Sequence, residues 1–434
     1  MTTIPDGFQE LLTASVGAGQ AEVVLEALQQ APSVSVRLNP AKLTECPFPE
    51  ATPVPWSPYG YLLKERPVFT LDPLFHAGCY YVQDTSAMYV GHVFRQVTAD
   101  LQPGCQVLDL CAAPGGKTTD LAASLRERFG DRYTLVANEV MRNRYSILRS
   151  NVETWGDARV NCVSRDPSTF GTEPLFHAIL ADVPCSGEGM FRKDAQAVAE
   201  WSPKTVEFCA ARSRRILSDI WPTLVPGGIL IYSTCTFNHL ENDDTVAWIA
   251  AELGADFCTP NEEILRFAQN DDFQVVNTQY GQLLLPGLVP GEGQYVAALR
   301  KHSSDGRDGR CVSRSIGPFF CDGKRASGSP DSHFLHTGSK KTGKAKDAFS
   351  GASAHFSATE NALSSAEEEA PVVNVDRETA LKYLHGDAIV LPQDAPIGPV
   401  TIGYQGHPLG PAKNLGKRCN NLYPKNKRIR MDIR

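Results

Sequence analysis

The central part of the chain alternates short apolar runs with longer amphipathic stretches. Five apolar runs have the length of buried strands: 107–110, 133–138, 160–163, 178–181 and 229–232. Three stretches with helical spacing lie between them: 117–129, 142–154 and 205–217. From 273 to 300 several short strand-like runs follow one another, which predicts antiparallel strands along one edge. The pattern therefore predicts an α/β, Rossmann-like domain with a doubly wound sheet over residues 101–300.

Three further regions flank this domain. Residues 1–100 predict a small N-terminal α+β module, with a helix at 7–30, a strand at 33–38 and a helix at 86–97. Residues 301–370 are rich in Ser, Gly, Lys, Asp and Ala, and have too few aliphatic residues to form a core, so we expect a disordered linker. Apolar patterning returns in residues 371–434, where we expect a short β-rich domain.

Composition narrows the class of protein. Hydrophobic residues make up 42% of the chain and charged residues 21%, and no long apolar run indicates a membrane span. Residues 1–10 lack the pattern of a signal peptide. The twelve cysteines include no Cys-x-x-Cys pair, which indicates neither a disulfide framework nor a zinc site. We therefore expect reduced thiols, no metal and a cytoplasmic location.

The charge distribution is uneven. A net charge of −7 argues mildly against nucleic-acid binding, but basic residues gather at the C-terminus with Asp432 as the one acid among them. These basic residues are Lys413, Lys417, Arg418, Lys425, Lys427, Arg428, Arg430 and Arg434. Such a tail suits a polyanion, although a simply solvated terminus remains the alternative.

One segment has the form of a cofactor loop. The first predicted strand ends at Asp109 and a turn with two adjacent glycines, Gly115 and Gly116, leads into the next helix. Glycines let the backbone approach a ligand, and the helix start offers free amide donors. The segment is neither a dinucleotide fingerprint nor a phosphate loop, and a plain turn remains possible. Glu139 closes the second strand, where an acid usually binds a ribose diol.

Two cysteines border the ends of predicted strands further along. Cys185 lies in the segment Ala181–Gly189 and Cys235 in Tyr232–Thr236. A single buried cysteine at a strand end is more often an inert small hydrophobe than a nucleophile. The three segments in this order, however, resemble the Nop/Sun family of RNA (cytosine-C5)-methyltransferases. The C-terminal strings around His407, Gly416 and Leu422 resemble the PUA-like RNA-binding domain of its bacterial ribosomal-RNA members.

The resemblance implies a cofactor, S-adenosyl-L-methionine, and a set of site residues. Cys235 would be the nucleophile, Cys185 would help to release the product, and Asp182 would protonate or hydrogen-bond ring nitrogen 3. The implied cofactor-binding residues are Cys111, Ala112, Ala113, Pro114, Gly115, Gly116, Lys117, Glu139, Arg144, Asp166 and Asp182. Among them, Asp166 would face the adenine amino group, and Arg144 would brace the side of the site near Glu139.

The two thiols suit this chemistry because carbon 5 of cytosine is a poor nucleophile. A thiolate that adds to carbon 6 leaves electron density on carbon 5, which then attacks the methyl group, and the thiolate must leave afterwards. The family's usual Asp-Ala-Pro-Cys stands here as Asp-Val-Pro-Cys, which adds bulk at Val183 beside the base pocket.

The resemblance also indicates the partners. We expect an RNA substrate, either ribosomal RNA or the small ribosomal subunit, and a monomeric enzyme whose first 100 residues help to bind RNA. The same reaction on transfer RNA and a non-catalytic ribosome-assembly factor remain alternatives. A DNA cytosine methyltransferase is disfavoured, because its nucleophile follows the Pro-Cys pair and it needs no Thr-Cys pair.

Overall fold

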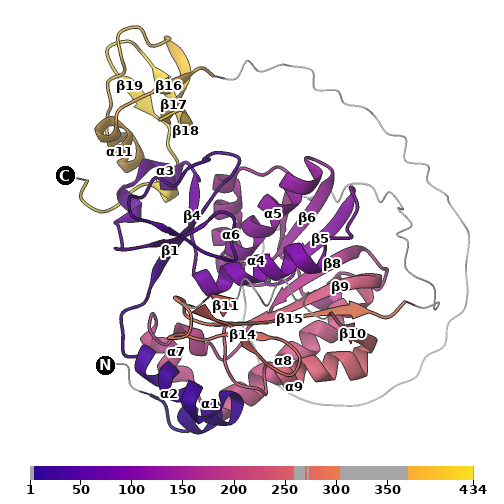
Figure 1. The fold of residues 1–434 in the computed structure, drawn as a ribbon. Helices are drawn as coiled ribbons and strands as arrows, with labels where there is room; N and C mark the ends of the chain where they lie inside the picture. Colours follow the sequence, from indigo (N-terminus) through magenta and orange to yellow (C-terminus); the bar gives the residue numbers. More distant parts are fainter. Residues whose placement is uncertain (1–3, 259–268, 271–272, 304–369, 434) are drawn as a thin grey trace, which may run out of the picture. The chain divides into compact units, whose positions relative to one another are not determined.

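A mixed sheet forms the centre of the computed structural model, which describes residues 4–258, 269–270, 273–303 and 370–433 (Figure 1). Its strand order is β13-β14-β15-β9-β8-β5-β6-β7, and β10 also pairs with β15. The strands are β5 (Cys105–Asp109), β6 (Tyr133–Asn138), β7 (Val160–Val163), β8 (Phe176–Asp182), β9 (Leu224–Thr234), β10 (Ala255–Phe257), β13 (Val276–Asn277), β14 (Gln282–Leu284) and β15 (Gln294–Lys301). Strands β5 to β9 are parallel, and β13, β14 and β15 are antiparallel. The predicted Rossmann-like fold is confirmed.

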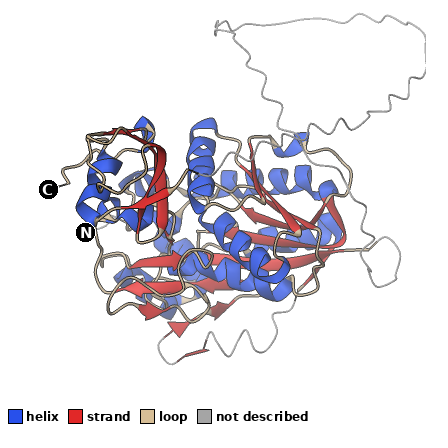
Figure 2. Cartoon of the chain, turned by 90° about the horizontal axis from the view of Figure 1, so that it is seen from above, coloured by secondary structure: helices blue, strands red, loops and turns tan. Residues whose placement is uncertain are grey.

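Each inner strand buries both of its faces, as the continuous apolar runs predict. In β8, Ile179 belongs to the core on one face of the sheet and Leu180 to the core on the other. In β9, Leu230 and Ile231 divide in the same way. Helices therefore cover both sides of the sheet (Figure 2).

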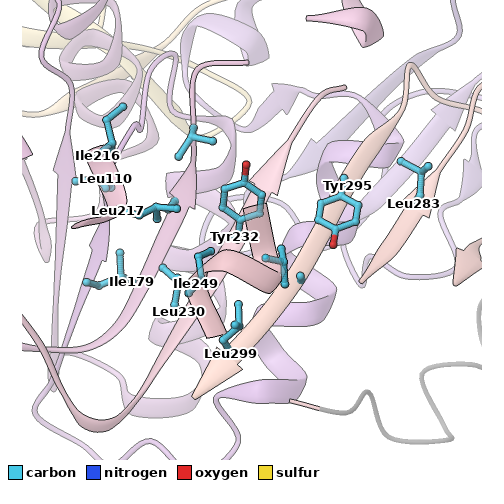
Figure 3. Close-up of a cluster of buried hydrophobic side chains, with 14 of the residues drawn as sticks. Leu110, Ile179, Ile216, Leu217, Leu230, Tyr232, Ile249, Leu283, Tyr295 and Leu299 are labelled. Atoms are coloured by element: carbon cyan, nitrogen blue, oxygen red, sulfur yellow. The ribbon is translucent and has the colours of Figure 1, made fainter. Parts of the chain in front are cut away.

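The first face packs against four helices: α1 (Phe8–Val16), α2 (Ala18–Ala27), α8 (Pro203–Ile220) and α9 (Asp243–Trp248). Figure 3 shows part of this core, where Leu217 of α8 and Ile249 lie beside Leu230 and Tyr232 of the sheet. Helix α8 begins where Ser202 Oγ accepts the Thr205 amide, an N-cap that the sequence Ser-Pro anticipates.

The opposite face packs against α4 (Thr85–Val97) and α5 (Gly116–Phe129), through Phe94 and Leu121 among others. Helix α6 (Arg142–Trp155) follows β6 and packs Leu148 and Val152 against Ala113 of the loop before α5. The short helix α7 (Ala195–Glu200) lies between β8 and α8. A two-stranded ribbon, β11 (Gln269–Asn270) with β12 (Phe273–Gln274), completes this part of the chain.

The N-terminal module has a four-stranded sheet in the order β2-β3-β1-β4, with α3 (Pro73–His76) before β4. Its strands are β1 (Val34–Leu38), β2 (Thr52–Pro53), β3 (Gly60–Leu63) and β4 (Tyr80–Val82). The predicted strand at 33–38 and the helix at 86–97 are present as β1 and α4. The predicted helix over 7–30 is two helices, because Gly17 has a φ of +83° and interrupts the helical hydrogen bonds.

The C-terminal region, described by itself, has a four-stranded sheet and one helix. The elements are β16 (Val372–Asn374), α11 (Arg377–His385), β17 (Gly398–Tyr404), β18 (His407–Asn414) and β19 (Cys419–Asn421). The β-rich pattern did not predict α11, although its ends carry ordinary signals. Asp376 accepts the Thr379 amide at the start, and Gly386 ends the helix with a φ of +98°.

None of the helices in the described residues combines the length and apolarity needed to cross a bilayer. Within the same residue ranges, no group of three His, Cys, Asp or Glu side chains could hold a metal ion. The predicted linker over 301–370 lies outside the described residues apart from its ends.

Candidate active site

The two cysteines meet at the carboxyl edge of the sheet. Strands β8 and β9 run parallel with Asp182 opposite Ser233, so the loops that follow them leave the sheet side by side. The sulfur atoms of Cys185 and Cys235 are 3.4 Å apart. This separation brings the two thiols into direct contact, as the expected cooperation of the two cysteines requires.

The two thiols differ in their electrostatics. The hydrogen bond to Cys235, together with burial, raises the pKa of Cys185 well above its ordinary value. Cys185 is therefore a thiol that donates toward the Cys235 sulfur. The ammonium group of Lys117 lies close enough to Cys235 for that sulfur to contribute to raising the Lys117 pKa. The Cys185 thiol is thus kept in its neutral form, and a cation lies near the other sulfur of the pair.

Lys117 also forms an ion pair with Asp182. Lys117 Nζ lies 2.9 Å from Asp182 Oδ2, and Gln294 Nε2 donates to Asp182 Oδ1 at 3.2 Å. Burial alone would lower the pKa of Lys117, but Asp182 outweighs that effect and raises it. Asp182 thus accepts hydrogen bonds on both oxygens, and Lys117 is held protonated beside it.

The predicted glycine loop joins β5 to α5. Gly115 precedes the helix with a φ of +111°, a conformation that side chains other than glycine rarely adopt. Asp109, at the end of β5, is fully buried, and its Oδ2 accepts the Thr118 hydroxyl at 2.6 Å. Its Oδ1 has no hydrogen-bond partner among the described residues, and burial raises its pKa to about 7.

Glu139 follows β6 and is linked to this loop through Arg144. Glu139 Oε1 accepts the Met141 amide, and Arg144 Nη1 lies 3.2 Å from Glu139 Oε2. Arg144 Nη2 also donates to Ala113 O at 2.7 Å. Arg144 therefore fixes the position of the loop relative to the acid at the end of β6.

Asp166 lies at the start of a 3₁₀ turn, Pro167–Thr169, after β7. Its Oδ1 accepts the Ser168 amide and the Ser168 hydroxyl, and these bonds lower its pKa. One of its oxygens is thus used as a cap. Its predicted contact with an adenine amino group remains a prediction.

The N-terminal module braces the glycine loop from outside the sheet. Arg37 of β1 is fully buried and donates to Gly116 O, Thr119 Oγ1 and Gln83 Oε1. Tyr81 of β4 donates its hydroxyl to Pro114 O at 3.2 Å. The predicted cofactor loop is therefore held by residues far from it in the sequence.

These elements enclose a hollow of about 190 Å³. It is lined by Tyr81, Val82, Gln83, Asp84, Ala87, Asp109, Cys111, Ala112, Ala113, Pro114, Gly116, Lys117 and Asp182. Most of the predicted loop residues lie on this wall, whereas Gly115, Glu139, Arg144 and Asp166 do not. The free Asp109 Oδ1 gives the hollow a buried acceptor that suits a cationic ligand group, and the glycine turn lets a ligand approach the backbone. The residues present therefore fit S-adenosylmethionine.

Sequence reasoning missed Gln294 and Asp84. Gln294 begins β15, and its Nε2 donates to Ser233 Oγ and Thr234 O as well as to Asp182. Asp84 lines the hollow and caps α4 by accepting the Ser86 amide. Asp84 stands in the helix-start pattern Asp-Thr-Ser, which signals the cap. No local pattern marks Gln294, which reaches the site only through the antiparallel pairing of β15 with β9.

Three family descriptions match the chain. Residues 96–300 match "16S rRNA methyltransferase RsmB/F", residues 4–85 match "N-terminal domain of 16S rRNA methyltransferase RsmF", and residues 370–429 match "Methyltransferase RsmF PUA domain". Proteins named ribosomal RNA small subunit methyltransferase F from Cronobacter sakazakii and Salmonella agona are 34% identical over 319 and 322 residues. In both cases the match covers 69% of this chain and 64% of the relative's length.

Solved structures share the fold. A methyltransferase homolog protein from Pyrococcus horikoshii is 25% identical, with a TM-score of 0.53, and the match covers 67% of this chain and 93% of that one. The structure of NSun6 from the same organism with SFG is 17% identical, with a TM-score of 0.55 and coverage of 69% and 99%. The likeness to NSun6 concerns the fold alone.

Proposed function

Because the chain belongs to the RsmB/F family of methyltransferases, we propose that it methylates carbon 5 of a cytosine in ribosomal RNA. The observation that carries this proposal is the 3.4 Å separation of the Cys185 and Cys235 sulfur atoms beside the glycine loop. A cofactor loop alone fits many methyl acceptors. A pair of thiols at its mouth fits a pyrimidine that must be attacked and then released.

The cofactor is S-adenosylmethionine, which supplies an electrophilic methyl group. The hollow beside the glycine loop would hold it, with Asp109 Oδ1 as an acceptor for positive charge and Lys117 at its inner end. Glu139 and Arg144 would shape the neighbouring wall, because Arg144 ties that acid to Ala113.

Cys235 starts the reaction on the base. Its thiolate forms a bond to carbon 6, and the ring electrons move toward nitrogen 3 and carbon 5. Lys117 stabilises the thiolate before attack, because its protonated amine lies beside the sulfur. Carbon 5 would then attack the methyl group, whose bond to the cofactor sulfur would break to leave a neutral thioether. Carbon 5 would at that point carry both the methyl group and its original hydrogen.

Asp182 and Lys117 act together at nitrogen 3. Asp182 already accepts from Lys117 and Gln294, so it serves as an acceptor that keeps Lys117 protonated. The ammonium of Lys117 is then the donor for the charge that develops on the ring. This proposal gives Lys117 the role at nitrogen 3 that the resemblance implied for Asp182, which was to protonate or hydrogen-bond the ring.

Release requires that carbon 5 lose its hydrogen as a proton to solvent water acting as the base, and that the bond from Cys235 to carbon 6 break. The ring electrons restore the aromatic base, and the Cys235 sulfur leaves as a thiolate. Cys185 is the neighbouring group that assists this step, since its thiol can donate a hydrogen bond to the departing thiolate. Its raised pKa keeps that proton available at neutral pH.

The matches to relatives named for ribosomal RNA and to the PUA domain support ribosomal RNA as the substrate. The target cytosine must be unstacked to expose carbon 6, so an unpaired or flipped base is expected. A ribosomal substrate would place the enzyme in the cytoplasm, where we expect it to act as a monomer.

The test uses Cys235→Ala and Cys185→Ala with labelled S-adenosylmethionine and small ribosomal subunits, 16S rRNA and transfer RNA as substrates. Cys235→Ala should abolish both methyl transfer and the covalent protein–RNA complex. Cys185→Ala should accumulate that complex on a denaturing gel. Exchanged phenotypes would refute the assignment of the nucleophile, and methylation of transfer RNA alone would refute the ribosomal substrate.

A further inference from the structure

Two buried acids lie behind the cysteine loops and take no part in the proposed chemistry. Glu188 has 1% of its surface exposed and Glu241 has none. Glu188 belongs to the loop that carries Cys185, and Glu241 follows the loop that carries Cys235. We name the loops 185–189 and 235–238 the release loop and the nucleophile loop.

Each acid binds the backbone of the opposite loop. Glu241 Oε2 accepts the Ser186 amide of the release loop at 2.9 Å. Glu188 Oε2 accepts the Phe237 amide of the nucleophile loop at 2.6 Å. The amides that they bind lie directly after Cys185 and close after Cys235. The position of each cysteine therefore depends on an acid that lies in or just after the loop of the other cysteine.

Asn238 connects the two acids. Its Nδ2 lies 2.9 Å from Glu188 Oε1 and 2.9 Å from Glu241 Oε1. Its Oδ1 accepts the Glu241 amide, and the indole of Trp201 donates to Glu188 Oε1. Every oxygen of the two carboxylates thus accepts at least one hydrogen bond. A fully satisfied buried network of this kind fixes a single arrangement of its members.

Two further contacts tie the loops directly. The Gly189 amide donates to Cys235 O at 2.7 Å, and a Cβ atom at Gly189 would lie only 2.8 Å from that oxygen. The hydroxyl oxygens of Ser186 and Thr236 are 2.9 Å apart. The loops are therefore packed at backbone distance, and a small change at either acid shifts one cysteine relative to the other.

Stability alone does not account for this arrangement. Neither carboxylate forms an ion pair within the described residues, so the charge is balanced only by neutral donors. Burying a charge costs several kcal/mol in general, and apolar residues of similar size usually hold a core at lower cost. This network is costly to bury, but it fixes the two loops together. It therefore indicates that the two cysteines must be held at a defined distance.

We propose that Glu188, Asn238 and Glu241 are positioning residues that set the distance between the nucleophilic and the releasing sulfur. This inference rests on the proposed function and adds to it a separate role for each acid. Glu241 holds the release loop, and Glu188 holds the nucleophile loop. The two acids therefore control different steps of the same reaction.

The test compares Glu241→Gln with Glu188→Gln, because a glutamine keeps the shape but accepts on only one of its two terminal atoms. Glu241→Gln should slow release, so the covalent protein–RNA complex per turnover should rise about tenfold. Glu188→Gln should slow formation of the complex by a similar factor without making it persist. Glu207→Gln, at an exposed position on α8, is the matched control and should change neither rate.

Two measurements distinguish a folding defect from the proposed effect on the two cysteines. Cofactor affinity and thermal unfolding are compared for each variant. Thr236→Val provides a milder change that keeps both acids and removes the hydroxyl that contacts Ser186 and accepts from Asn238. Thr236→Val should raise the amount of complex in the same direction as Glu241→Gln. The proposal is wrong if both glutamine variants lose activity in parallel with stability and leave the ratio of complex to turnover unchanged. Failure of the Cys235→Ala test would instead overturn the proposed function itself.

Discussion

Replacing Asp109 by Asn should stabilise the protein without cofactor and weaken cofactor binding. Asp109 is fully buried, and its pKa is raised to about 7 from an ordinary 3.8 because burial disfavours the carboxylate. A difference of this size corresponds to about 4 kcal/mol of destabilisation once the group is ionised. Asparagine removes the charge and keeps an oxygen that can accept the Thr118 hydroxyl.

The direction in which stability changes with pH follows from proton binding. The folded protein binds the Asp109 proton more tightly than the unfolded chain, so this group's contribution to stability is complete below about pH 4. That contribution is lost as the pH rises toward the folded-state pKa of about 7. The wild type and Asp109→Asn should therefore be equally stable near pH 4. At pH 8 the variant should be more stable by up to about 4 kcal/mol.

Urea unfolding from pH 4 to pH 8, without cofactor, measures the difference in the free energy of unfolding. Asp394→Asn, at an exposed position, is the control and should follow the wild type throughout. Calorimetry then gives the affinity for S-adenosylmethionine. Wild-type affinity should rise about tenfold from pH 6 to pH 8 as Asp109 ionises, and Asp109→Asn should lack that component. Parallel stability curves for the two proteins, or a less stable variant at pH 8, would refute the reasoning.

Three further changes test other parts of the site. Arg37→Met should lower the free energy of unfolding by about 3–5 kcal/mol in urea, because it removes the buried cation that lies 3.9 Å from Asp120 and leaves Gln83 Oε1 without its donor; a loss below 1 kcal/mol would contradict this. Lys117→Met should reduce methyl transfer about a hundredfold at saturating cofactor, since Cys235 and Asp182 lose their cation, and an unchanged rate would remove Lys117 from the mechanism. Deleting residues 371–434 should weaken RNA binding and flatten its dependence on salt; an equal salt slope would argue against phosphate contacts there.

The sequence determined the order of the central elements and the position of the glycine loop between β5 and α5. Strand β6 has the predicted bounds, and β5, α5 and α6 begin or end within a few residues of them. These predictions succeeded because buried parallel strands are apolar throughout, whereas apolar residues in helices recur every three to four positions. The two patterns can therefore be distinguished from the local sequence. The parallel pairing then placed Cys185 and Cys235 at the same edge, as the strand-end positions implied. The helix break at Gly17 and the helix α11 were not predicted, since a few cap residues decide them.

Only the tertiary structure decided which distant side chains complete the site. Gln294 reaches Asp182 through the antiparallel pairing of β15 with β9, and Arg37 reaches the glycine loop from the N-terminal sheet. Glu188 binds the nucleophile loop, and Glu241 binds the release loop. None of these contacts has a local signal, because each depends on the register of strands far apart in the chain. The sequence therefore indicated the candidate reactive residues, and the packing of the sheet and its loops determined how those residues are held.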